Sequence, residues 1–188
     1  WGIENPIYRA KVLGEFSEDS QWAVVRQSDI AACRLDREQT YTAEDLLPVE
    51  LGVDVGGGGD ETVIRERRGK VAGREWRAHT DRHEKIAPLV LHAIRESGAT
   101  AVKIDSIGIG YGVIGELRND NALRGVAISA LNVAEKASKP DKFANLRAEL
   151  WWEVGRGLSE RGGWDLSRMD NADSTIAQLL EPQWDVDP

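Results

Sequence analysis

Two aspartates associated with short apolar runs are the residues best placed to do chemistry. Asp54 lies within LGVDV, and Asp105 ends the run VKID. Burying an ionised carboxylate is costly unless a partner or a cation compensates it, and Lys103 is the only basic residue inside either run. If the two runs form neighbouring strands, a divalent cation would relieve their repulsion. Carboxylate oxygens favour Mg²⁺ or Mn²⁺, although a single such aspartate would be explained equally well as a strand-end cap.

A glycine run, GGGGD at 56–60, follows the first aspartate directly. Consecutive glycines let a phosphate or another backbone approach closely, and a tight hairpin explains them equally well. No GK[ST] follows and a strand rather than a helix comes next, which excludes a P-loop and a dinucleotide-binding fingerprint. Asp60 is either a further acidic residue of the site or a turn residue.

A basic stretch comes next in a chain whose net charge is −8. Residues 63–103 hold 10 basic and 5 acidic side chains, and the excess is greatest in Arg65, Arg67, Arg68, Lys70, Arg74 and Arg77. A solvated hairpin explains this stretch. A surface that contacts phosphates becomes competitive if the neighbouring aspartates are catalytic.

The elements that must position these residues follow from hydrophobic periodicity and turn signals. Strands are predicted at 50–56, 61–67, 70–79, 100–106 and 125–132, and helices at 28–34, 81–97, 110–120, 141 or 142 to about 161, and 174–180. A meander that leads into strand–helix–strand crossovers gives an α/β fold with a mixed sheet and helices on both faces. Right-handed crossover places strand 100–106 beside strand 50–56.

The 188 residues suffice for one substantial domain, which we place at 49–188, with residues 1–48 as an arm that packs on it. We interpret the chain as a fragment of a longer protein. No apolar run approaches the roughly 18 residues that a membrane helix needs, so we expect no membrane partner. The single Cys33 excludes a disulfide framework, and with only three histidines any metal site must depend on carboxylates.

Several blocks together resemble the nuclease domain of the large terminase subunit of tailed bacteriophages, the DNA-packaging motor protein. They are YRAKVLGEF (8–16), LGVDVGGGGDETVI (51–64), VKIDSIGIGYGV (102–113), FANLRAELWWEV (143–154) and IAQLLEP (176–182). The resemblance implies a ribonuclease H-like fold and metal-dependent endonucleolytic cutting of concatemeric double-stranded DNA. It makes Asp54 and Asp105 the first and second acidic ligands of Mg²⁺ or Mn²⁺, with two ions in the site.

The resemblance also implies partners and a location. They are the terminase ATPase domain, the small terminase subunit, the portal and the cytoplasm of the bacterial host. The family's ATPase half is absent from this sequence, so we expect neither ATP hydrolysis nor DNA translocation. The family carries a third acidic ligand, which we expect beyond Pro188, because Asp170 and Asp173 fall where the family has a loop.

Other classes of function stay open at this point. The segment GVDVGGGGDETV (52–63) also resembles the first phosphate loop of actin-like and sugar-kinase folds, which would need a second, duplicated domain and an adenosine-binding motif. A catalytically silent docking module would suit the net charge of −8 and the acidic tail. A junction resolvase shares the ribonuclease H-like fold and its carboxylates, but the RAELWW block favours a terminase.

Overall fold

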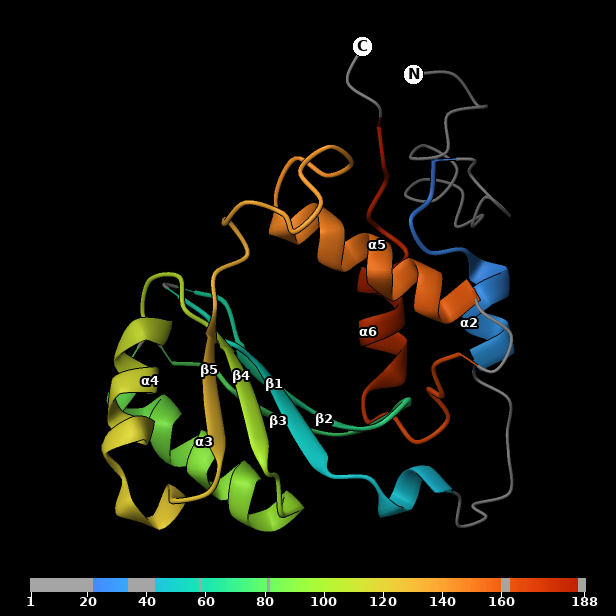
Figure 1. The fold of residues 1–188 in the computed structure, drawn as a ribbon. Helices are drawn as coiled ribbons and strands as arrows, with labels where there is room; N and C mark the ends of the chain where they lie inside the picture. The colour runs from blue at the N-terminus through green and yellow to red at the C-terminus, as the bar shows by residue number, and fades with distance from the viewer. Residues whose placement is uncertain (1–21, 34–42, 58, 81, 160–162, 186–188) are drawn as a thin grey trace.

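The computed structural model describes residues 22–33, 43–57, 59–80, 82–159 and 163–185. Its centre is a five-stranded sheet in the order β3-β2-β1-β4-β5. The strands are β1 (Val49–Asp54), β2 (Thr62–Arg68), β3 (Val71–Ala78), β4 (Ala101–Asp105) and β5 (Ala127–Leu131) (Figure 1). The first three form an antiparallel meander, whereas β4 runs parallel to both β1 and β5. The predicted adjacency of the strands that carry Asp54 and Asp105 is confirmed.

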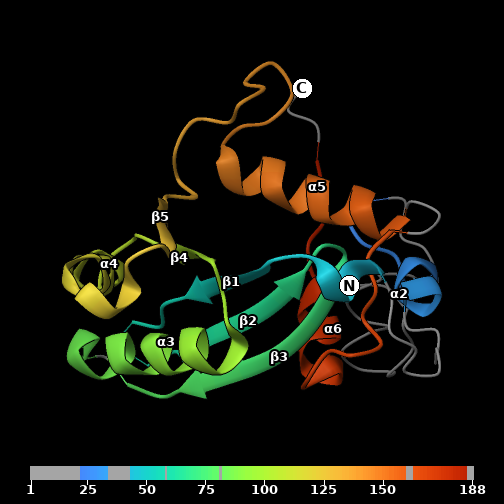
Figure 2. The ribbon, with the colours of Figure 1, turned by 60° about the horizontal axis from the view of Figure 1, so that its bottom comes forward.

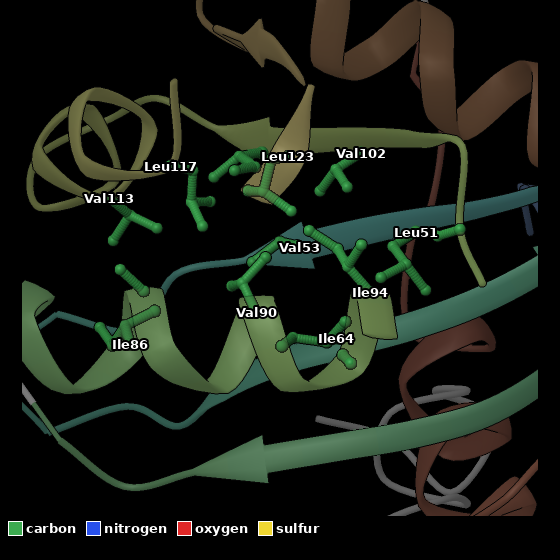
Figure 3. Packing of buried hydrophobic residues seen from close by; sticks show 14 of the residues in the cluster. Leu51, Val53, Ile64, Ile86, Val90, Ile94, Val102, Val113, Leu117 and Leu123 are labelled. Atoms are coloured by element: carbon green, nitrogen blue, oxygen red, sulfur yellow. The ribbon is translucent and has the colours of Figure 1, made fainter. Parts of the chain in front are cut away.

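One face of the sheet is covered by two helices, α3 (His83–Ser97) and α4 (Gly110–Asn119). Side chains alternate across a strand, so every second residue of β1 and β4 points toward these helices. Gly98 ends α3 in the left-handed conformation, with φ of 70°, as a stop signal at that position predicts. The buried cluster between sheet and helices includes Leu51, Val53, Ile64, Ile86, Val90, Ile94, Val102, Ile104, Val113, Leu117 and Leu123 (Figure 3).

A second hydrophobic cluster lies beyond the other side of the sheet. It joins α2 (Gln27–Cys33), α5 (Leu146–Ser159) and α6 (Ala172–Leu179) to Ala72 of β3. Figure 2 shows α3 on one side of the sheet and α5 on the other. Gly155 of α5 allows close helix packing, because a Cβ there would overlap the carbonyl oxygen of Val24. Two short 3₁₀ turns, η2 (Ala43–Leu46) and η3 (Asn121–Leu123), complete the described elements.

The starts of α2, α3, α5 and α6 differ from the sequence-based prediction by one to five residues. The helix predicted to start at 141 or 142 begins at Leu146, because the residues before it form turns whose carbonyls accept the first backbone N–H groups of α5. The helix predicted over 28–34 spans Gln27–Cys33. Asp81, the first residue of the helix predicted over 81–97, and the block 8–16 lie outside the described residues.

The buried cluster under β4 sets the stability of the part of the sheet that carries Asp105. Replacing Ile104, which is fully buried, with Ala should destabilise the protein by about 2–5 kcal/mol, because the lost methyl groups leave a cavity. Urea unfolding monitored by circular dichroism measures this. The control is Leu46→Ala at a side chain that is 75% exposed, which should stay within about 0.5 kcal/mol of the parent. Equal effects of the two substitutions would contradict the assignment of Ile104 to the core.

Candidate metal centre

Asp54 and Asp105, here called the acid pair, are the last residues of two adjacent parallel strands. The register aligns Val53 with Ile104, and both of these side chains point into the cluster under α3 and α4. Because side chains alternate, both aspartates point to the opposite face, at the carboxyl edge of the sheet. Asp54 is exposed and Asp105 is half-buried. The structure therefore brings together two carboxylates that are far apart in the sequence, on one face and at one edge.

The electrostatics of the acid pair are unfavourable without a cation. Burial against the surrounding protein raises the pKa of Asp54 above its usual value, and the charges of Asp105 and Asp60 raise it further. The guanidinium of Arg147 acts in the opposite direction and lowers it. Although the Asp54 side chain reaches solvent, its ionised form is thus destabilised by like charges, which is the condition that a bound divalent ion would relieve.

The glycine turn after β1 brings Asp60 back toward the acid pair. The backbone N–H of Gly56 donates to Oγ1 of the fully buried Thr62 at 3.1 Å. A Cβ at Gly56 would overlap the carbonyl oxygen of Asp60, so only glycine fits at this close approach of two backbone segments. Asp60 itself is exposed, and its charge reaches Asp54.

The junction between β4 and α4 holds Asp105 in place. Its Oδ1 accepts a hydrogen bond from the backbone N–H of Ile107 at 3.0 Å. Gly110 starts α4 directly against the Asp105 carbonyl oxygen, which a Cβ at Gly110 would overlap. The glycine-rich segment SIGIGYG (106–112) therefore packs the start of α4 closely against the end of β4, where Asp105 lies.

The donor set of the acid pair consists of hard carboxylate oxygens and suits Mg²⁺ or Mn²⁺. Within the described ranges, no group of three or more His, Cys, Asp or Glu side chains lies close enough together to hold a metal ion. Asp60 influences Asp54 only through its charge, and Asp170 lies elsewhere, with its Oδ2 accepting from the backbone N–H of Glu75 at 3.2 Å. Among the described residues, the candidate site therefore comprises the two carboxylates of the acid pair.

Three arginines of the predicted basic stretch, Arg65, Arg67 and Arg68, lie on β2, and each forms an ion pair. The pairs are Arg65 with Glu75, Arg67 with Glu50, and Arg68 with Glu66. Arg65 also donates to the carbonyl oxygen of Asp170 at 2.7 Å and to Oγ1 of Thr175 at 2.9 Å, which ties α6 to the sheet. The backbone N–H of Lys70 donates to Glu44 at 2.9 Å. A DNA-binding role for these four residues stays a prediction.

Sequence reasoning did not assign a role to Arg147, which the structure places near the acid pair. The backbone N–H of Arg147 donates to the carbonyl oxygen of Val133 at 2.9 Å, and that of Leu146 donates to Glu135 at 2.8 Å. Val133 comes two residues after Leu131, the residue of β5 that pairs with Asp105. The first turn of α5 is therefore tethered to the chain that leaves the carboxyl edge of the sheet (Figure 1).

Two other residues of the NLRAE segment (145–149) fix this helix start. Asn145 caps α5, with its Oδ1 accepting from the backbone N–H of Ala148 at 2.9 Å. Glu149 is buried and accepts hydrogen bonds from the backbone N–H of Ser138, at 2.6 Å, and from the Ser138 hydroxyl. The segment was visible in the sequence. The partners of Arg147 and Glu149, however, lie in the preceding loop, which has no regular periodicity that would predict its position.

Comparisons with solved structures show the fold. The nuclease domain of the large terminase subunit gp2 of bacterial virus Sf6 is similar with a TM-score of 0.69 at 16% identity, covering 88% of this chain and 84% of that one. A K428A mutant of the Sf6 domain with manganese gives a TM-score of 0.63 at 15% identity, over 84% and 81% of the two chains. The large terminase nuclease of thermophilic phage G20c with bound magnesium gives 0.59 at 16% identity, over 86% and 81%.

The chain thus has the fold of phage terminase nuclease domains, and the predicted ribonuclease H-like α/β class is confirmed. No protein-family model and no curated protein matches it. Among the described helices, none has the length and apolar character to cross a membrane.

The close packing of Gly110 against the Asp105 backbone can be tested by substitution. Gly110→Ala should destabilise the protein by about 1–3 kcal/mol, because the added methyl group must displace the backbone at Asp105. Gly115→Ala in the same helix is the control. Nothing lies within 4 Å of a Cβ at Gly115, so this substitution should be neutral or stabilising by up to about 1 kcal/mol. Thermal unfolding compares the two variants, and a Gly110→Ala protein as stable as Gly115→Ala would contradict the close packing.

The hydrogen bonds that Glu149 accepts from Ser138 predict a stability that depends on pH. Hydrogen bonds from Ser138 lower the pKa of Glu149 below the unfolded value of 4.5. Its stabilising contribution is therefore present above pH 4.5 and is lost as the pH falls through the lower, folded-state value. Wild type should melt at a higher temperature than Glu149→Gln at pH 6, and the difference should shrink as the pH falls below about 4. A difference in melting temperature that does not change with pH would show that the ionised form contributes nothing.

Proposed function

We propose that this chain is a divalent-metal-dependent endonuclease domain that cuts double-stranded DNA during phage genome packaging. The observation that carries the proposal is the convergence of Asp54 and Asp105 on one face at the carboxyl edge of β1 and β4. The proposal is supported by the similarity in fold to terminase nuclease domains. Structures of such domains include one with manganese and one with bound magnesium.

In the proposed site, Asp54 and Asp105 hold Mg²⁺ or Mn²⁺, with Asp60 as a further acidic residue, and two ions occupy it. When bound, such ions activate a water molecule and stabilise the leaving oxygen of a phosphodiester. The chain's own residues provide the orientation. The N–H of Ile107 fixes Oδ1 of Asp105, and the exposed Gly57, which has no side chain, leaves room for a phosphate backbone to come close.

The proposal extends to the partners that the resemblance implies. They are concatemeric double-stranded DNA, the terminase ATPase domain, the small terminase subunit and the portal, in the cytoplasm of the bacterial host. Contacts to the DNA backbone without reading of bases would make cutting largely independent of sequence. Arg65, Arg67, Arg68 and Lys70 are part of this proposal as backbone contacts, although the three arginines would have to share their guanidinium groups with the carboxylates that they already bind.

Asp54→Asn tests the proposed centre. It should weaken Mn²⁺ binding in calorimetry by more than about a hundredfold and abolish Mn²⁺-dependent nicking of supercoiled plasmid, because a charged ligand is lost. The melting temperature without metal should be unchanged or higher, since like charges destabilise the ionised Asp54 in the fold.

The matched control is Asp120→Asn, at the end of α4. Asn retains an oxygen for the hydrogen bond that Asp120 accepts from the N–H of Ala122, at 2.8 Å. This variant should bind Mn²⁺ and nick DNA as the wild type does. Wild-type Mn²⁺ affinity in Asp54→Asn would refute the assignment of the centre.

A further inference from the structure

The face of the sheet that carries the acid pair, here called the open face, is formed by Gly52, Asp54, Lys103, Asp105 and Ser129. Gly52, Lys103 and Ser129 stand side by side on β1, β4 and β5, one row before the row of the acid pair. All three are exposed, and nothing lies within 4 Å of a Cβ built at Gly52. The surface next to the acid pair is therefore accessible. Lys103 is the one cation among the five residues of the open face.

Arg147 lies in the first turn of α5, the helix on the side of the sheet to which the acid pair points. Its backbone is fixed by the hydrogen bond to Val133, and its side chain is exposed. No ion pair or side-chain hydrogen bond of Arg147 occurs within the part of the chain that the structure describes. Val133 follows the end of β5, whose last residue, Leu131, pairs with Asp105, so the first turn of α5 lies beside the acid pair.

These two cations differ from the arginines of β2. Each of Arg65, Arg67 and Arg68 has a carboxylate within ion-pair distance, which offsets its charge. Lys103 acts on Glu50 only through its charge, and Glu50 already binds Arg67. Among the basic side chains of the five described strands, Lys103 is therefore the one without an ion pair, and it stands beside the acid pair.

The balance of charge indicates which anion fits. The first divalent ion would already offset the two negative charges of Asp54 and Asp105, and the second ion of the proposed site would add positive charge. The charges of Arg147 and Lys103 would therefore be left for another ligand. A DNA strand supplies a series of singly charged phosphates along one direction. A forked guanidinium binds two oxygens of one phosphate, whereas an ammonium group acts as a point charge and tolerates variable geometry.

We propose that Arg147 and Lys103 form a phosphate clamp on the open face, with Arg147 binding the phosphate to be cut and Lys103 binding a neighbouring phosphate of the same strand. The clamp rests on the proposed nuclease function and names the residues that would hold its substrate. It differs from the basic stretch of β2 and β3, which the sequence had suggested for this role.

The test compares Arg147→Gln, Arg147→Lys and Lys103→Gln with a control of equal charge, Arg124→Gln. Arg124 is exposed and lies before β5, at the other end of the sheet from the acid pair. Binding of a short DNA duplex is measured by fluorescence anisotropy over a series of salt concentrations without divalent ions. Mn²⁺-dependent nicking and Mn²⁺ calorimetry are measured on the same proteins.

Arg147→Gln should lower kcat/KM for nicking about ten- to a hundredfold, because charge-assisted hydrogen bonds to the phosphate are lost. Arg147→Lys should recover part of this loss, since it keeps the charge but not the fork. Arg147→Gln and Lys103→Gln should each reduce the slope of log Kd against log salt by about 1. Mn²⁺ affinity should not fall in any of them, and Arg124→Gln should match the wild type throughout.

The outcomes separate the clamp from the function on which it rests. A wild-type chain that neither binds Mn²⁺ nor nicks DNA would overturn the proposed function itself. A wild type that does both, while Arg147→Gln and Lys103→Gln bind and nick DNA as Arg124→Gln does, would overturn the clamp alone. An equal loss in all three glutamine variants would also overturn it, since this would be a general effect of net charge. Melting temperatures check folding, and the Lys variant keeps the test decisive if Arg147→Gln is unstable.

Discussion

Repulsion between the carboxylates of Asp54 and Asp105 is the constraint around which this molecule is arranged. Parallel pairing of β1 with β4 holds them on one face, and the buried Val53 and Ile104 prevent a shift of register that would separate them. The sheet therefore maintains a charge arrangement that isolated strands would avoid. Tight glycine contacts on both sides, at Gly56 and Gly110, keep the flanking backbone close to the pair.

The distribution of the remaining charges reconciles an acidic chain with the polyanionic substrate that we propose for it. Net charge is −8, yet Glu50, Glu66 and Glu75, on β1, β2 and β3, each lie against an arginine of β2. Partnered charges of this kind contribute little to the long-range field. The local field at the carboxyl edge depends instead on the acid pair, on any ion it holds, and on the cations that border it.

Hydrophobic alternation and glycine punctuation were enough to predict the five strands, the order of the elements and the adjacency of Asp54 with Asp105. The ion pairs of β2 were not predictable, because they depend on which residues lie opposite one another after the strands pair, as Arg67 and Glu50 do. The start of α5 was misplaced for a similar reason. Its first N–H groups bind carbonyls of an irregular loop, and Arg147 consequently received no role although its motif had been noted.

The position of Arg147 depends on two layers of the molecule at once. Its helix, α5, packs in the cluster formed with α2 and α6, whereas the aspartates belong to strands anchored on α3 and α4. A small shear between the two layers would move the guanidinium relative to the carboxylates and leave each hydrophobic core intact. Contacts that set the layers in register, such as the hydrogen bonds from Arg65 to Asp170 and Thr175, therefore determine where the Arg147 guanidinium lies relative to the acid pair.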